Sequence, residues 1–149
     1  MLTRITAGLL LLLFASACNE DEKELAPIVG KWKGTLAEVE FKPFGIPIPV
    51  KKEDDSFDSE IEFKSDGTLI VTDDSKTTEG NWQLNGDKLT TDINFGTDLI
   101  DLSGTYTIEV LTQTSLVFYL KKENEKFTDP DSGQTISGDF KGTLHFERI

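Results

Sequence analysis

Hydrophobic and polar residues alternate with a period of two along most of the chain after residue 28. Short runs of this kind, separated by clusters of Gly, Asn, Asp and Ser, are typical of β-strands with one buried face. No long stretch after residue 28 has the period of an amphipathic helix. The pattern therefore predicts eight strands, at residues 30–41, 57–64, 68–73, 77–84, 88–95, 104–111, 115–123 and 138–148.

The connections between most of these strands are short. Asp66-Gly67 and Asn85-Gly86 are tight hairpin turns, because both pairs accept positive φ angles, and residues 112–114 form a third short link. Short links force consecutive strands to be antiparallel neighbours. We therefore predict an all-β fold, an eight-stranded antiparallel up-and-down β-barrel, in which closure removes the exposed strand edges.

One parity of each predicted strand is apolar and is expected to face the barrel interior. These positions are Phe57, Ile61, Phe63, Leu69, Val71, Trp82, Leu84, Leu89, Ile93, Phe95, Tyr106, Ile108, Val110, Leu116, Phe118, Leu120, Phe140, Leu144 and Phe146. In the first strand the apolar parity switches from Trp32 and Leu36 to Val39 and Phe41, which predicts a bulge near Ala37. An eight-stranded barrel is just wide enough to be filled or to hold one small ligand, and rings of this bulk favour a filled interior or a small cavity.

Two longer segments interrupt the regular spacing. Residues 42–56 contain the apolar loop positions Phe44, Ile46, Ile48 and Val50 among prolines, which exclude a central strand. Either these side chains cap the core, or they gate a cavity or meet a partner. Residues 127–137 are predicted to be a polar excursion between the last two strands.

The first 17 residues have the layout of a cleaved export signal. A basic start is followed by an apolar run that is too short to span a membrane and ends in small residues. Cys18, placed at the expected cut, resembles the lipobox cysteine of bacterial lipoproteins, so we predict a lipid anchor on Cys18. The competing interpretation, a free thiol in a cytosolic protein, leaves the leader unexplained.

Residues 18–27 are expected to be the lipidated cysteine and an acidic tether, whose polar residues 19–24 are solvated, and residues 28–149 a single domain. Acidic residues after the cysteine resemble the mark that sends some lipoproteins to the cell surface, and they equally fit a spacer. The formal net charge is −12, which disfavours nucleic acids and anionic lipid headgroups as partners. A lone cysteine excludes a disulfide within the chain.

Gly30-Lys31-Trp32, at the start of the first strand, resembles the Gly-x-Trp signature of the lipocalins. Residues 63–68, 80–86 and 106–116 resemble the lipocalin-like domains of bacterial lipoproteins. The resemblance implies a calycin-type barrel in which a basic side chain of the last strand, here Arg148, packs over Trp32 at the closed end. Arg148 can alternatively clamp a ligand carboxylate, although the position favours the structural role.

Other candidate sites have ordinary explanations. His145 has outward parity and no cysteine or second histidine with which to form a zinc site, so we expect an exposed bystander. Residues 129–133 resemble the opening of a calcium loop, but Gly133 and Phe140 stand where the EF-hand needs other residues. The acidic pairs at 54–55 and 73–74 are typical of a solvated surface. No metal, cofactor or catalytic group is predicted.

These observations predict a non-enzymatic, lipid-anchored protein of the outer membrane that binds a small apolar ligand at the barrel mouth. The alternative is a surface protein-interaction or inhibitor-like module with a filled barrel and no small-molecule ligand.

Overall fold

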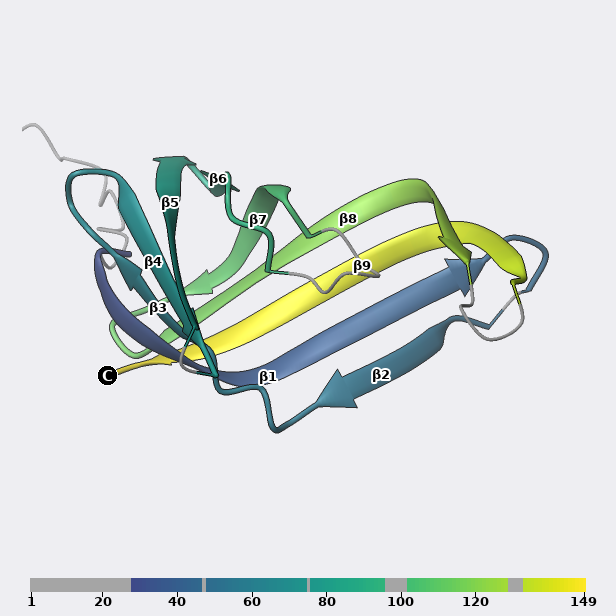
Figure 1. Cartoon of the computed structure of the whole chain (residues 1–149), viewed down its shortest axis with the longest axis horizontal. Coiled ribbons are helices and arrows are strands. Elements are labelled where there is room, and N and C mark those ends of the chain that lie inside the picture. The colour runs from purple at the N-terminus through teal and green to yellow at the C-terminus, as the bar shows by residue number, and fades with distance from the viewer. Residues whose placement is uncertain (1–27, 47, 75, 96–101, 129–132) are drawn as a thin grey trace, which may run out of the picture.

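The computed structural model describes residues 28–46, 48–74, 76–95, 102–128 and 133–149 (Figure 1). These residues form nine strands and no helix. The strands are β1 (Gly30–Pro43), β2 (Val50–Asp54), β3 (Glu60–Phe63), β4 (Thr68–Asp73), β5 (Lys76–Asn85), β6 (Lys88–Thr91), β7 (Gly104–Leu111), β8 (Ser115–Thr128) and β9 (Thr135–Arg148). Within the described part of the chain, no helix is long and apolar enough to cross a membrane.

Eight strands close into an antiparallel barrel, which confirms the predicted fold class. The strands β3 to β9 pair in chain order, and β9 returns to pair with β1. The first part of β1 pairs with β3, from Gly30 opposite Phe63 to Lys33 opposite Glu60. Its second part pairs with β2, so β2 is a ninth strand outside the closed barrel.

Two β-bulges decide which side chains enter the core. The first lies in β1 between Gly34 and Leu36, slightly earlier than predicted, and it turns Val39 inward. The second lies in β7 between Ile108 and Val110. The prediction that Val110 faces the interior was wrong, because this bulge leaves Val110 exposed and packs Leu111 against the core instead.

The hydrophobic core lies inside the barrel, continues along one face of β1, β8 and β9, and contains most of the predicted inner residues. Its buried apolar members are Ile28, Trp32, Ile61, Phe63, Leu69, Val71, Leu89, Ile93, Leu102, Tyr106, Leu116, Phe118, Leu120, Phe140, Leu144 and Phe146. Phe57, Trp82, Leu84, Phe95 and Ile108 are partly buried and pack against this cluster.

Four strands extend beyond the barrel as a sheet in the order β2-β1-β9-β8 (Figure 1). We call residues 37–43, 50–54, 120–128 and 135–142 the projecting sheet. The sequence prediction was wrong in two places here. Among the described residues of 127–137, residues 127–128 and 135–137 are strand, because β8 runs to Thr128, which pairs with Thr135 at the start of β9. Residues 42–56 contain β2, which begins at Val50, after the prolines.

Candidate functional site

The closed end of the barrel is built around Trp32, whose side chain is fully buried. Its Nε1 donates a hydrogen bond to the carbonyl of Ile28 at 2.8 Å. The guanidinium of Arg148 lies 4.1 Å from the centre of the indole ring, the arrangement that the family resemblance implies. Gly30 has φ of 137°, and a Cβ there would lie 2.4 Å from Nη1 of Arg148. Glycine is therefore required for the arginine to cross this position.

Two donors of Arg148 are directed at the protein's own backbone. Nη1 donates to the carbonyl of Val29 at 3.0 Å, and Nε donates to the carbonyl of Gln113 at 2.7 Å. These bonds join the ends of three separate segments over the indole ring. The geometry favours the structural role of Arg148 over a clamp for a ligand carboxylate.

Aromatic side chains form a continuous series of contacts through the barrel interior. Phe95 packs on Tyr106, Tyr106 on Phe118, Phe118 on Phe146, and Phe146 on Phe57, with ring centroids 5.0 to 5.7 Å apart. Three of these four contacts are edge-to-face, the geometry that aromatic rings prefer. The described part of the interior is therefore occupied by rings.

Exposed apolar side chains gather at the far end of the projecting sheet. We call this group the apolar tip: Phe44, Ile46, Ile48, Val50 and Ile136. The first four are 53 to 73% exposed and lie at the end of the β1–β2 hairpin. They do not cap the core, so that alternative was wrong. The backbone N–H of Phe44 donates to the carbonyl of Ser137 at 2.9 Å, which places Ile136 beside the loop.

The outer face of the sheet is hollowed between β2 and β7 into a groove of about 270 Å³. His145 and Glu38 line it, with Nε2 of the histidine 2.5 Å from Oε2 of the glutamate. His145 has the predicted outward parity, but it is partly buried and paired, so the expectation of an exposed bystander was wrong. The partner was missed because it is 107 residues away in the sequence.

Other charged groups of the outer surface are paired locally. Lys121 and Lys141 both lie over the ring of Tyr119, at 5.2 and 4.6 Å from its centroid. Nζ of Lys51 lies 3.0 Å from Oε2 of Glu40, and this hydrogen bond raises the pKa of Lys51 above its ordinary value. Exposed pairs of this kind contribute little to stability, as is usual on a protein surface.

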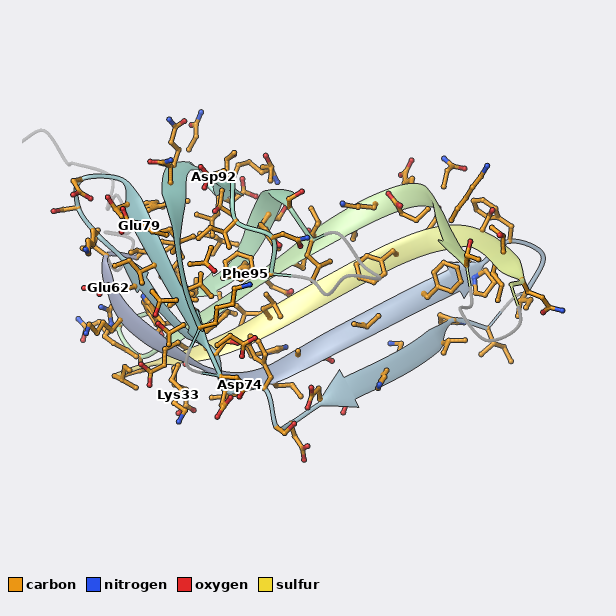
Figure 2. All side chains as sticks on the ribbon, in the orientation of Figure 1. Lys33, Glu62, Asp74, Glu79, Asp92 and Phe95 are labelled. Carbon is orange, nitrogen blue, oxygen red and sulfur yellow. The ribbon has the colours of Figure 1, made fainter. Side chains whose placement is uncertain are left out.

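The predicted acidic pairs lie on the surface. Asp73 and Asp74 come together with Asp58, and their carboxylates are within 4.8 Å of one another, but all three are exposed (Figure 2 labels Asp74). Asp54 accepts hydrogen bonds from the backbone and hydroxyl of Ser56, which lower its pKa. Cys18 and the calcium-like residues 129–132 lie outside the described part of the chain.

Asp92 joins β5 to the segment after β6 (Figure 2). It accepts hydrogen bonds from the backbone N–H of Asn81 at 2.6 Å and from the Asn81 side-chain amide at 2.9 Å. These bonds lower the pKa of Asp92 below its ordinary value of 3.8, and the backbone bond from Thr68 does the same for Asp66. The carboxylates therefore contribute stability that is present above pH 3.8 and is lost as pH falls through the lowered values.

We accordingly expect the free energy of unfolding to decrease once the pH falls below about 4. Denaturant titrations between pH 7 and pH 2 measure this slope. Asp92→Asn is expected to flatten it, because the amide has no charge to lose. Asp55→Asn, at an exposed aspartate just after β2, is the control and should leave the slope unchanged. An Asp92→Asn protein with the slope of the native chain would contradict the assignment.

Comparison with known proteins adds one match. The family model described as a lipocalin-like domain matches residues 28–118, which include the Gly30–Trp32 segment and seven of the barrel strands in whole or in part. Searches of curated proteins and of solved structures found no match. The matched region begins where the core begins, at Ile28, and the closed barrel agrees with it. The chain therefore belongs to the family of lipocalin-like domains.

Proposed function

We propose that this protein is a lipid-anchored, non-catalytic docking module of the bacterial outer membrane. A lipid on Cys18 holds one end of the domain, and the apolar tip at the other end contacts a partner. Family membership accounts for the barrel and does not identify the partner, since one fold can have many functions.

One observation carries this proposal, the gathering of exposed apolar side chains at the end of the molecule opposite residue 28. Strand β1 starts at the closed end and finishes beside the apolar tip (Figure 1). Its 14 residues span about 46 Å at roughly 3.3 Å per residue. A group of large apolar side chains exposed at one end of a domain is typical of an interaction surface. The tip is therefore separate from both the tether and the barrel interior.

The export leader and Cys18 support the anchor. A chain with this leader, one cysteine at the cut and a polar stretch after it has the features of a lipoprotein precursor. The tether of residues 18–27 reaches about 35 Å when fully extended, at roughly 3.5 Å per residue.

The distribution of titratable groups supports a non-catalytic role. Among the described residues, no Asp, Glu, Lys, Arg or His side chain is buried. Catalytic acids and bases usually lie in clefts that shift their pKa values. The pair formed by His145 and Glu38 instead lines a groove on the outer face of the sheet.

Family membership favours a second candidate function, the binding of a small apolar molecule. Eight-stranded barrels can enclose one small ligand. The aromatic series from Phe95 to Phe57 and the position of the 44–50 loop at the hairpin end weigh against a spacious interior beneath that loop. The docking role is therefore our first proposal and ligand binding our second.

Position-specific cross-linking in intact cells tests the docking role. A photoreactive phenylalanine analogue replaces Ile48 in the full acylated protein, and a matched form carries it at Ile149, which is 61% exposed at the opposite end. We expect adducts at position 48 that disappear when Ile46→Glu is added, and none at position 149. Equal adducts at both positions, or none at position 48, would reject the tip as the working surface.

A further inference from the structure

We infer that the apolar tip inserts into the interfacial region of a lipid bilayer. This inference rests on the proposed function, because it names the partner of the same surface. The domain would then have two attachment points, the lipid at one end and the tip at the other, and would lie with its long axis along the membrane.

The side chains of the loop suit an apolar environment. Between Lys42 and Lys51, the described residues 43–46 and 48–50 include no charged or hydrogen-bonding side chain. Ile48 is 73% exposed and Phe44 is 55% exposed, so their transfer from water to lipid removes apolar surface that the fold leaves uncovered. Ile136 of β9 widens the same surface.

The backbone of the loop also carries few unsatisfied donors. Pro43 and Pro49 have no N–H group. The N–H of Phe44 donates to the carbonyl of Ser137, and the N–H of Ile46 donates to the carbonyl of Pro43 at 3.3 Å. An unsatisfied backbone group in lipid costs several kilocalories per mole. These features lower the cost of placing the loop in the interface.

Charge around the tip differs from charge on the barrel. The projecting sheet carries equal numbers of lysines and carboxylates, whereas the described remainder of the domain has an excess of carboxylates. Lys42, Lys51 and Lys52 bracket the loop and are exposed. Lysines next to an inserted segment can keep their charged ends at headgroup level. The overall acidity that disfavours lipid contact for the barrel is therefore absent at this end.

The shape of this end favours a bilayer over a protein. The β1–β2 and β8–β9 hairpins end together and project beyond the barrel (Figure 1). A projecting loop needs a complementary pocket on a protein partner, whereas a bilayer interface accepts it without one. Insertion of this hairpin end also leaves the barrel core in place.

Vesicle flotation tests the inference with the whole mature chain carrying Cys18→Ser, which removes the lipid and leaves the tip intact. Vesicles contain phosphatidylcholine and phosphatidylethanolamine. We expect this chain to bind the vesicles with a partition coefficient of roughly 10³–10⁴ M⁻¹, the upper value being that of one myristoyl chain. Binding of this strength is measurable at millimolar lipid concentrations. Ile48→Glu is expected to lower it at least about tenfold.

Ile149→Glu is the matched control, because it makes the same change at a similarly exposed isoleucine distant from the tip. It should float like the parent, and both variants should show the parent's melting temperature. Phe44→Trp supplies a second readout. Its emission should shift to the blue with vesicles and be quenched by brominated lipid.

A parent chain that fails to float, or an Ile48→Glu variant that floats equally well, would overturn the inference. Failure here is distinguishable from failure of the docking role. A protein adduct at position 48 in cells without vesicle binding rejects the bilayer as partner and keeps the docking role. Absence of both vesicle binding and the adduct at position 48 rejects the bilayer as partner and the docking role alike.

Discussion

Trp32→Ala is expected to lower the free energy of unfolding by about 3–5 kcal/mol, the range for truncating a buried aromatic side chain. Three contacts are lost together. The indole is fully buried, its Nε1 bonds to the carbonyl of Ile28, and its face holds the guanidinium of Arg148. Because Arg148 ties β9 to the residues before β1, the closed end should loosen where the barrel is joined. Equilibrium denaturation in guanidinium chloride measures the loss.

Trp82→Ala is the control for this prediction. Trp82 is also on a barrel strand and its Nε1 donates to the carbonyl of Lys64 at 3.0 Å, but its side chain is only partly buried. We expect a clearly smaller loss for Trp82 than for Trp32. Equal losses at the two positions would show that the closed end has no special role in stability.

Phe118→Ala is the second large effect, also about 3–5 kcal/mol, with formation of an internal cavity. Phe118 is fully buried and contacts three rings, Phe95, Tyr106 and Phe146. An apolar cavity of this kind remains dry and can bind benzene-sized molecules. We therefore expect the variant to be stabilised by added benzene, while the parent chain is not. Thermal melts with and without benzene measure both outcomes.

Val117→Ala is a suitable control, since Val117 precedes Phe118 on β8 but faces the outer groove. This variant should lose less free energy of unfolding than Phe118→Ala, and its melting temperature should not respond to benzene. A parent chain that is itself stabilised by benzene would show that its interior already has space for an apolar ligand, which would contradict a barrel filled by rings.

The sequence predicted the barrel because its strands alternate clearly and its turns have distinctive chemistry. Asp66-Gly67 and Asn85-Gly86 mark hairpins with local signals, and the inward positions from Ile61 to Phe146 supply a period of two. Pairing of the first and last strands followed from closure. The Trp32–Arg148 contact came from the family resemblance and could not have come from alternation alone.

The projecting sheet could not be predicted in the same way. All five residues of β2 are exposed, so the strand has no alternating pattern, and backbone pairing with β1 holds it. The extension of β8 toward Thr128 is similarly polar. The bulge in β7 that exposes Val110 leaves no local signal either, whereas the parity switch in the first strand did indicate the bulge that turns Val39 inward. The position of the 44–50 loop depends on β2, on the long β8 and on these bulges, so it could not be predicted from the sequence.

Native mass spectrometry of the full protein, extracted from its own cells, tests most directly whether the working surface lies outside the barrel. The parent chain and its Ile48→Glu form are compared. We predict that neither form retains a small molecule, because aromatic rings of the described residues contact one another through the barrel interior. A small apolar molecule bound one-to-one in both forms would contradict the account, since the domain would then hold it independently of the tip.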